Sequence, residues 1–388
     1  MPHQSEVIAF VWDNFGPPHV DRCEATARHL QDKFRVVGLE LFSRSETYSW
    51  TASTGVSFEK HTLFHLKQPS SIRIFIRLLG RLKSLKARHI FLCHYQEWYI
   101  LCAATLLRVM GKRVYFMGDS KFDDYCRWVG REWLKSFYLA PYVGALTASI
   151  RSKEYLEFLG WGVRPIELGY DTISVDRIRR LACSPPAPNG VDHSERHFTI
   201  VARYVPKKNI ALALQAFADQ TMRDDDSNAR KLVLCGSGPL ESELREQARR
   251  LSIDDLVEFR GFVQTDEVCR VLSKTLCLIL PSIEEQFGQV VPEALAMGVP
   301  IVLSTNCGAR DELVRSGVNG FVIEPDNVTG LRNFLSLIAR DAELWARMSR
   351  ATQLFVSLGD VERFARAVGK LIAGNVELEA RSLQSDRP

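Results

Sequence analysis

Short apolar runs alternate with amphipathic stretches along most of the chain. In the first half the apolar runs predict strands, and the longer stretches of mixed polarity between them predict helices. The predicted strands are 7–12, 34–41, 90–93 and 114–117, and the predicted helices are 23–30 and 98–109. Strands and helices in alternation are typical of a parallel sheet covered by helices on both faces. We make no prediction for 43–66, which is polar and aromatic without a clear period.

A second alternating series follows a break in the pattern. Residues 183–194 contain three prolines, a glycine and several polar side chains, which favours a linker. Beyond it the predicted strands are 198–202, 232–235, 257–259, 276–280 and 301–303, and the predicted helices are 211–218, 241–251, 266–273 and 361–378. We therefore predict a first Rossmann-like domain at 1–183, a linker at 184–195, a second Rossmann-like domain at 196–360 and, at 361–388, a C-terminal helix that crosses back toward the first domain and has a frayed end.

The predicted fold class is α/β, with two doubly wound domains that face each other across a cleft. The chain has 388 residues, which is too many for one ordinary core and enough for two. Ligands of doubly wound sheets bind at the carboxyl ends of the strands. We therefore look for functional residues directly after the predicted strands.

Charge is distributed unevenly. The net charge is only +4, but residues 60–135 hold fifteen Lys or Arg against five Asp or Glu, which favours an acidic partner such as a phosphate group or a membrane surface. Within this stretch, 70–86 predicts an amphipathic basic helix. Its predicted apolar face comprises Ile72, Phe75, Ile76, Leu79 and Leu82, and its basic face Arg73, Arg77 and Arg81. Peripheral contact with an anionic membrane and a solvated outer helix both remain open for it.

The nine cysteines show no metal-ligand spacing. Their number is odd and no Cys-x-x-Cys pair occurs, so we expect reduced thiols in a cytoplasmic protein. The first apolar run is six residues long and ends at Asp13-Asn14, which predicts a strand and not a signal peptide. No apolar run approaches the ~20 residues that a membrane-spanning helix needs.

The segment 281–300 holds the strongest functional signal. Glu285 and Glu293 stand eight residues apart in it, directly after a predicted buried strand. Pro292 suits the first turn of a helix, and Gly298 suits its end. One acid is therefore expected on a loop and the other in the first helical turn, beside an N-terminus that attracts anions. This arrangement suits a ligand with both phosphate groups and sugar hydroxyls, such as a nucleotide sugar.

The same segment resembles the signature of a known family. Glu285 is followed by Phe287 and Gly288, and Glu293 opens the sequence Glu-Ala-Leu-Ala-Met-Gly-Val-Pro. This order resembles the donor-site signature of glycosyltransferase family 4, which comprises retaining enzymes of the GT-B fold. The resemblance covers most of the second half; in the first half it rests on layout and on 160–171. It implies a nucleoside diphosphate sugar as donor, with Glu285 at the sugar hydroxyls and Glu293 at the ribose.

Further donor contacts are expected after other predicted strands. Arg203 and Lys208 stand five residues apart at such a place, and two cations there can clamp a diphosphate and stabilise its charge as it leaves. Their spacing resembles the diphosphate-binding pair of the family. The other predicted donor-binding positions are Gly236, Gly238, Val263, Phe287, Gly288, Val290 and Val291. For the two glycines a plain tight turn is the alternative, and we expect Phe262 to pack in the core.

The first half is expected to supply the acceptor side, where the chain departs from the family pattern. The loop 13–19 replaces the usual Gly-Gly turn; we expect Gly16 and His19 to serve there, with two prolines stiffening the loop. Asp119 follows a predicted strand where relatives place a histidine, and it is our candidate for orienting the acceptor hydroxyl. His94, at the end of another strand, is the second candidate, with a structural role as its alternative.

These features together predict a retaining, hexosyltransferase-type glycosyltransferase. It would move a sugar from a nucleoside diphosphate sugar to a glycan or lipid-linked acceptor in surface polysaccharide biosynthesis, with Glu285, Asp119 and His94 as catalytic residues. Because protein cations would meet the charge of the diphosphate, we expect no metal or other cofactor, and no nucleic acid partner. A sugar-nucleotide epimerase and a non-catalytic nucleotide-sugar-binding partner of another transferase remain alternatives. A nicotinamide oxidoreductase is disfavoured because Glu241 stands where a third glycine would be needed.

Overall fold

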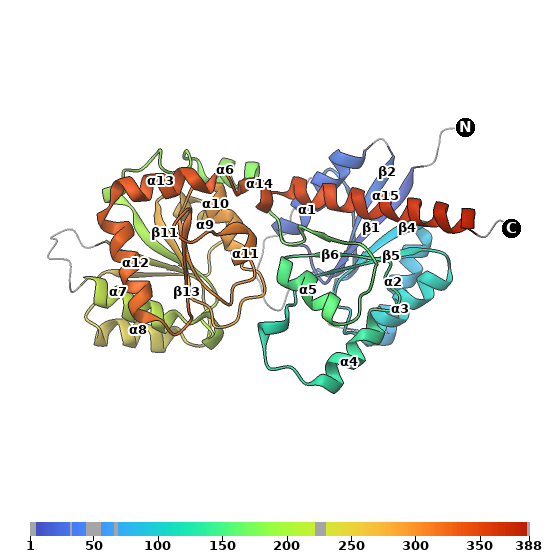
Figure 1. The fold of residues 1–388 in the computed structure, drawn as a ribbon, viewed down its shortest axis with the longest axis horizontal. Coiled ribbons are helices and arrows are strands. Elements are labelled where there is room, and N and C mark those ends of the chain that lie inside the picture. The colour runs from blue at the N-terminus through green and yellow to red at the C-terminus, as the bar shows by residue number, and fades with distance from the viewer. Residues whose placement is uncertain (1–4, 32, 44–55, 66–68, 222–229, 386–388) are drawn as a thin grey trace. The chain divides into compact units, whose positions relative to one another are not determined.

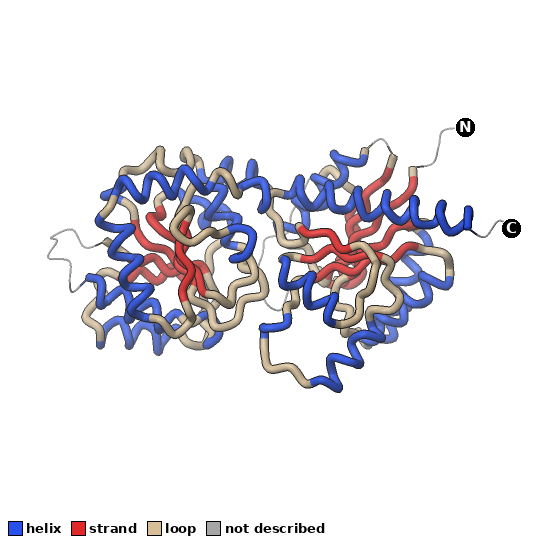
Figure 2. Tube along the Cα trace, viewed as in Figure 1, coloured by secondary structure: helices blue, strands red, loops and turns tan. Residues whose placement is uncertain are grey.

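The chain folds as two compact units, each a parallel sheet between helices (Figures 1 and 2). The computed structural model describes residues 5–31, 33–43, 56–65, 69–221 and 230–385, with side chains through residue 374. The first unit comprises Met1–Phe122, Cys126–Thr172 and Val361–Pro388, and the second comprises Asp123–Tyr125 and Ile173–Asp360. The predicted α/β class with two doubly wound sheets is confirmed.

The first unit has a sheet of seven parallel strands in the order β3-β2-β1-β4-β5-β6-β7. The strands are β1 (Glu6–Trp12), β2 (Phe34–Phe42), β3 (Glu59–Phe64), β4 (Ala87–Leu92), β5 (Arg113–Gly118), β6 (Gly144–Thr147) and β7 (Ile166–Leu168). The helices are α1 (Pro17–Leu30), α2 (Ser71–Ser84), α3 (Trp98–Val109), α4 (Val129–Tyr138), α5 (Ile150–Phe158) and α15 (Val361–Ser385). A short 3-10 turn at Phe122–Asp124 begins in this unit, and its last two residues are assigned to the second. The strand order reverses between β1 and β4, where a doubly wound sheet holds its ligand.

The second unit has six parallel strands in the order β10-β9-β8-β11-β12-β13, and its order reverses between β8 and β11. The strands are β8 (His197–Val201), β9 (Leu232–Cys235), β10 (Val257–Gly261), β11 (Thr275–Leu280), β12 (Ile301–Ser304) and β13 (Gly320–Ile323). The helices are α6 (Val175–Ala182), α7 (Ile210–Thr221), α8 (Glu241–Arg250), α9 (Thr265–Ser273), α10 (Val290–Ala296), α11 (Arg310–Leu313), α12 (Val328–Arg340), α13 (Ala342–Thr352) and α14 (Val356–Gly359), with 3-10 turns at His193–Glu195 and Pro206–Lys208.

Burial on both faces explains why the central strands are apolar throughout. All six residues of β11 are buried, and so are all four of β9 and of β12. A parallel sheet is covered by helices on both sides, so its strands carry continuous apolar runs and not an alternating pattern. The helices need only one apolar stripe each, which is why their sequences are mixed.

The C-terminal helix α15 belongs to the first unit. Its buried side chains recur at helical spacing, at Val361, Phe364, Ala365, Val368, Leu371 and Ile372. Val361 and Ala365 pack against Ala25 of α1, and the Phe364 ring lies 5.4 Å from that of Phe10 in β1. The tail of the chain therefore completes the helical layer over the first sheet (Figure 1).

The main crossings between the units follow Thr172 and Asp360, and the short segment Asp123–Tyr125 is also assigned to the second unit. The first crossing differs from the predicted linker at 184–195, which lies wholly inside the second unit. There Ala187 is buried, and its N–H donates to the carbonyl of Met297 at 2.9 Å. A segment rich in proline thus packs as part of a core, because its backbone finds partners at the end of α10.

Two other expectations about local structure are wrong. Pro17 and Pro18 do not stiffen a loop: they form the first turn of α1, where a missing N–H costs nothing. On α2, Ile74, Leu78 and Leu82 face the core. Ile72 and Ile76 were predicted on the apolar face but are 60% and 62% exposed, beside the arginines.

All nine cysteines are free thiols, six of them buried. In the part of the chain that the structure describes, none of the helices is both long enough and apolar enough to span a bilayer. The same described residues contain no group of three or more His, Cys, Asp or Glu side chains arranged to hold a metal ion.

Candidate active site

The loops after β8 and β11 meet at the point where the second sheet reverses its strand order. β8 leads into Arg203 and the 3-10 turn at Pro206–Lys208, and β11 leads into the loop that carries Glu285. These two strands are hydrogen-bonded neighbours, so their carboxyl ends lie side by side. The sheet topology thus brings together the cations and the first acid that the sequence singled out.

Lys208 and Glu285 form an ion pair at this edge. The Lys208 ammonium contacts the Glu285 carboxylate, and the two side chains are only 15% and 12% exposed. The Ser282 hydroxyl donates to the same carboxylate oxygen at 3.1 Å. Asn209, which follows in the left-handed conformation (φ 55°), donates its side-chain amide to the carbonyls of Pro281 and Pro325 at 3.1 and 2.6 Å. Both loops are therefore held by polar contacts.

Backbone contacts set the position of the acidic loop. The Ile283 N–H donates to the carbonyl of Lys207 at 2.8 Å, which joins this loop to the one after β8. On the other side, the Gly308 N–H donates to the Glu285 carbonyl at 3.1 Å. A Cβ atom on Gly308 would lie 1.9 Å from the carbonyl oxygen of Gln286, so only glycine permits this approach. The Glu285 backbone is thus fixed from two sides.

The two neighbouring acids of this loop differ in exposure. Glu285 lies against Lys208 and is mostly buried. Its neighbour Glu284 is more open at 30% and pairs with Lys207, with 2.9 Å between Nζ and Oε1. Arg203 is exposed, and its side chain makes no ion pair or hydrogen bond to any described residue. The site thus offers one guanidinium that is open and one ammonium that is paired.

The two glycines after β9 have a structural explanation. A Cβ on Gly236 would lie 1.8 Å from the Ala202 carbonyl oxygen, and one on Gly238 would lie 2.5 Å from that of Tyr204. The N–H of Tyr204 donates to the carbonyl of Ser237 at 2.9 Å. Glycine is therefore required there for close contact between this turn and the loop after β8, which favours the tight-turn alternative.

Val263 and Phe262 lie just beyond β10. Val263 is partly buried against Val233, Cys235 and Val271. Phe262 does not pack in the core as expected, since it is 42% exposed. The strand ends at Gly261, so Phe262 follows it at the carboxyl edge of the sheet.

Helix α10 begins at Val290, with Glu293 in its first turn as expected. Phe287, Val290 and Val291 are buried, and the Val291 N–H already donates to the Gly288 carbonyl at 2.9 Å. Gly288 has φ +96°, a conformation that favours glycine.

Glu293 is half-buried at the other end of this motif. Burial raises the pKa of Cys269 on α9 to about 12, and the nearby negative charge of Glu293 adds to this effect. Glu293 therefore lies close to α9.

The reversal point of the first sheet carries a second polar pair. Asp13 follows β1 and His94 follows β4, and their Oδ2 and Nε2 atoms are 3.4 Å apart. Both side chains are nearly half exposed, at 45% and 41%. His94 has φ +56°, in the left-handed region that few non-glycine residues occupy. Its role on the acceptor side stays a prediction.

Sequence reasoning missed Asp13. The available signal was its position, because it is the first polar residue after a strand whose last six residues are buried, at the sheet edge where ligands bind. The N–H of Phe15 donates to the buried Glu40 carboxylate of β2 at 2.9 Å, which fixes the loop that carries Asp13. Lys60 also pairs with Glu40, at 3.2 Å.

The backbone N–H of Gly16 already has a hydrogen-bond partner. Gly16 caps α1, and its N–H donates to Nδ1 of His19 at 3.0 Å. Burial, with the nearby charges of Arg22 and His94, holds the pKa of His19 well below its ordinary value, so the ring is neutral. The ring also packs on Trp12, 4.8 Å between centroids. Both predicted acceptor residues thus have structural contacts in α1, close to His94.

Asp119 lies after β5, at the same edge of the sheet. Its carbonyl accepts a hydrogen bond from the Ser152 hydroxyl at 2.8 Å. Burial raises the pKa of Tyr170, and the negative charges of Asp171 and Asp119 contribute, so Asp119 lies close to that phenol. Tyr170 accepts from the Trp12 indole N–H at 3.1 Å and contacts the Cys93 thiol at the same distance. A buried polar network therefore lies beneath the predicted acceptor edge.

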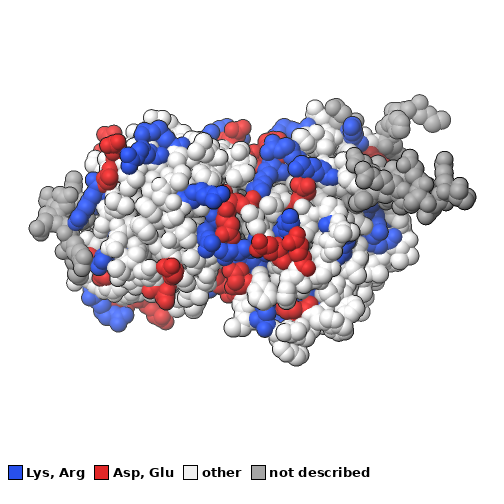
Figure 3. All heavy atoms as spheres, viewed as in Figure 1, with Lys and Arg blue, Asp and Glu red and all other residues white. Residues whose placement is uncertain are grey.

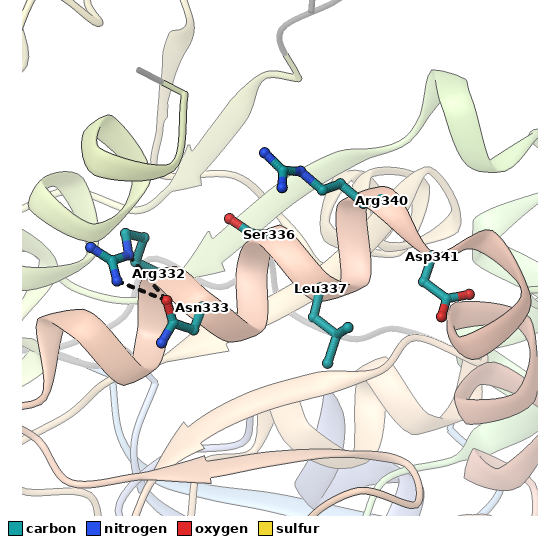
Figure 4. Close-up of a pocket in the computed structure, with 6 residues that line it drawn as sticks. All are labelled: Arg332, Asn333, Ser336, Leu337, Arg340 and Asp341. Carbon is teal, nitrogen blue, oxygen red and sulfur yellow. Dashed lines mark hydrogen bonds between the residues drawn. The ribbon is translucent and has the colours of Figure 1, made fainter. Parts of the chain in front are cut away.

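A hollow of about 390 Å³ lies elsewhere, along α12 (Figure 4). Its lining residues are Arg332, Asn333, Ser336, Leu337, Arg340 and Asp341. The Arg332 guanidinium donates to its neighbour Asn333 at 2.8 Å, and no residue of either sheet edge takes part. The hollow is therefore separate from the candidate site.

Each of the two Rossmann-like units carries polar residues at its reversal point, which is the place where doubly wound folds bind ligands. Residues 186–380 match the family model "Glycosyl transferases group 1". The chain belongs to this family, as its resemblance to glycosyltransferase family 4 predicted.

Curated relatives match only in part. The chain is similar to N-acetyl-alpha-D-glucosaminyl L-malate synthase of Bacillus anthracis, with 30% identity over 41% of this chain and 40% of that protein. It is also similar to D-inositol 3-phosphate glycosyltransferase of Rhodococcus opacus (strain B4), with 33% identity over 43% of this chain and 39% of that protein. The matched region thus spans about two fifths of the length of each relative.

Solved structures match over nearly the whole chain and support the GT-B fold. Sucrose-phosphate synthase from Thermosynechococcus elongatus superposes with a TM-score of 0.72 at 15% identity, covering 96% of this chain and all of that one. Anabaena Alr3699/HepE, solved in complex with UDP and glucose, has a TM-score of 0.69 at 16% identity, covering 95% and 100%. The predicted GT-B fold is confirmed.

Proposed function

We propose that this protein is a retaining glycosyltransferase that takes its sugar from a nucleoside diphosphate sugar bound at the carboxyl edge of the second sheet. The observation that carries the proposal is the Lys208–Glu285 pair, with Ser282 bonded to the same carboxylate, at the reversal point between β8 and β11. An ammonium and a carboxylate side by side match a ligand that joins a diphosphate to a sugar. Family membership supports the same reaction class.

Each group at this edge has a proposed role. The exposed Arg203 guanidinium and the Lys208 ammonium meet the diphosphate and stabilise the charge that develops on it as the sugar leaves. Glu285, released from Lys208, accepts hydrogen bonds from the sugar hydroxyls, and Glu293 binds the ribose. Because two protein cations supply the counter-charge, we propose that transfer needs no metal.

The first sheet is proposed to bind the acceptor. Asp13 and His94 stand 3.4 Å apart at its reversal point, both nearly half exposed, and Asp119 lies along the same edge. Carboxylate and imidazole groups are suited to orient a hydroxyl for attack. We propose a glycan or lipid-linked acceptor, as used in surface polysaccharide synthesis.

Calorimetric titration with UDP, GDP, ADP and NAD tests the donor site. We expect one nucleoside diphosphate to bind and NAD to stay silent; HepE was solved with UDP, so UDP is the first ligand to try. Incubation of the matching nucleotide sugar with candidate acceptors then distinguishes the functions by product. Free nucleoside diphosphate with a glycosylated acceptor supports transfer, an epimerised sugar indicates an epimerase, and binding without product indicates a non-catalytic partner. Binding of NAD alone would refute the proposal.

A further inference from the structure

Helix α4 in the first unit has its polarity inverted. The side chains it buries are Glu132, Lys135 and the capping residue Leu139, so two of the three are charged. A surface helix of a water-exposed protein normally buries an apolar stripe and shows its charges to solvent. In α4 the charged side chains instead lie on the buried face.

The buried face of α4 is a satisfied polar network. Lys135 Nζ donates to Glu132 at 2.9 Å and to the Tyr155 hydroxyl of α5 at 2.7 Å, and that hydroxyl donates to Glu132. Arg127 adds a third charge, 3.6 Å from Glu132. Burial alone would raise the pKa of Glu132, but the hydrogen bonds from Tyr155 and Lys135 outweigh it and lower the pKa, so the carboxylate stays ionised. The orientation of α4 is therefore specified by its polar contacts.

The opposite face of α4 is apolar and open. Its exposed side chains, with their exposed fractions, are Trp128 (75%), Val129 (82%), Trp133 (66%), Leu134 (50%) and Phe137 (53%). Trp133 and Phe137 stand one turn apart, with ring centroids 4.7 Å from each other. In Figure 3 the lower edge of this unit, where Figure 1 places α4, is mostly free of charged side chains. We call these five residues the aromatic face.

We propose that the aromatic face of α4 is a membrane-docking surface that lies in the headgroup region of an anionic bilayer. Tryptophan and phenylalanine beside leucine and valine are the composition that favours the membrane–water interface. The helix has ten residues, about 15 Å at 1.5 Å per residue, so it lies along the surface and does not span it.

Charge also favours a lipid surface. The one acid of α4, Glu132, is buried and neutralised by its partners, whereas Arg131 is exposed beside the aromatic face. The charge that this helix presents outward is therefore positive, which complements anionic lipid. This surface is distinct from α2, and the inference goes beyond sugar transfer because it concerns where the protein is held.

The test is sedimentation of the full chain with vesicles of phosphatidylglycerol and phosphatidylcholine, and with vesicles of phosphatidylcholine alone. We expect binding to the anionic vesicles, and a partition coefficient lower by about tenfold or more for the variant Trp133→Ser with Phe137→Ser. The matched control is Leu354→Ser, an apolar side chain 75% exposed in the second unit, which should bind as the parent does. Both variants should retain the parent thermal unfolding and the parent affinity for nucleoside diphosphate, so this test is independent of the donor site.

Other results would overturn the inference. It fails if the parent protein stays in the supernatant, if it binds neutral vesicles equally well, or if the double variant binds anionic vesicles as the parent does. It also fails if the parent is a dimer by analytical ultracentrifugation and the double variant is a monomer. The aromatic face would then be covered by a second copy of the chain.

Discussion

Replacing Glu285 by glutamine should separate donor binding from sugar transfer. Lys208 is paired with Glu285 in the structure. A diphosphate that binds Lys208 must therefore compete with this carboxylate. Glu285→Gln keeps an acceptor for the Ser282 hydroxyl but removes the competing charge. We therefore expect transfer to be lost while diphosphate binding is retained or improved.

The burial of the pair sets the size of both effects. A charge-assisted hydrogen bond between mostly buried groups contributes roughly 1.5–3 kcal/mol. If binding of the diphosphate costs about 1 kcal/mol of the interaction between Lys208 and Glu285, removing the Glu285 charge tightens binding of the free nucleoside diphosphate about fivefold. Lys208→Met removes the cation itself and should weaken binding by about 2 kcal/mol, or roughly thirtyfold. Loss of the sugar contacts made by Glu285 should lower the transfer rate by about a hundredfold or more.

The assay is titration calorimetry with the nucleoside diphosphate that the parent protein binds, followed by a transfer assay with the matching nucleotide sugar. The matched control is Glu284→Gln, because this neighbour pairs with Lys207 in a more exposed position and should change neither quantity. Thermal unfolding checks that each variant is folded. If Glu285→Gln weakens diphosphate binding as much as Lys208→Met does, the two side chains do not compete and the reasoning is refuted.

Four further predictions rest on other parts of the structure. Gly298→Ala should lower the free energy of unfolding by about 3 kcal/mol, because φ is +71° and the new Cβ would lie 2.2 Å from the Ala187 oxygen. The control Gly317→Ala, with φ +80° and no atom within 4 Å of the new Cβ, should lower it by only about 1 kcal/mol. Equal losses of the two variants in urea unfolding would contradict the clash at Gly298. Burial lowers the pKa of His197 to about 4, so between pH 6.5 and pH 4 the unfolded chain binds a proton that the native chain does not. Up to about 3 kcal/mol of the stability present above pH 6.5 should therefore be lost as the pH falls to 4. If the unfolding midpoint of His197→Gln falls with pH as steeply as that of the parent, His197 does not make this contribution. His94→Asn, which tolerates the left-handed backbone, should slow transfer about tenfold or more and leave nucleoside diphosphate affinity unchanged, and a matching loss of affinity would remove His94 from the acceptor side. Arg77→Glu with Arg81→Glu should weaken sedimentation with anionic vesicles if α2 touches the membrane, whereas unchanged partitioning would leave α2 a solvated helix.

The sequence by itself determined the local elements with a strong period. Strands predicted from apolar runs, such as β9 at Leu232–Cys235, and the helix α3 at Trp98–Val109 have the bounds that the pattern indicated. Their polarity is set by the layers around them, and the chain carries that information residue by residue. The spacing of Glu285 and Glu293, with Pro292 between them, likewise predicted one acid on a loop and one in a first helical turn, where α10 has it.

The sequence pattern did not predict the short strands β6 and β7 or the orientation of α4. β6 and β7 have four and three residues, too few to show a period, and each is defined by its neighbour in the sheet. No helix was predicted at α4, and its charged side faces inward because Lys135 and Glu132 hydrogen-bond to Tyr155.

Only the tertiary structure decided how the site is assembled. Lys208 and Glu285 are far apart in the chain, and Asp13 and His94 come from different strand ends; each pair meets because the strand order reverses between their strands. Strand order depends on contacts across the whole unit, which no local pattern contains. The burial of Glu285 against Lys208 is such a contact: the place of Glu285 on a loop after a strand was predicted from the sequence, whereas its pairing with Lys208 was not.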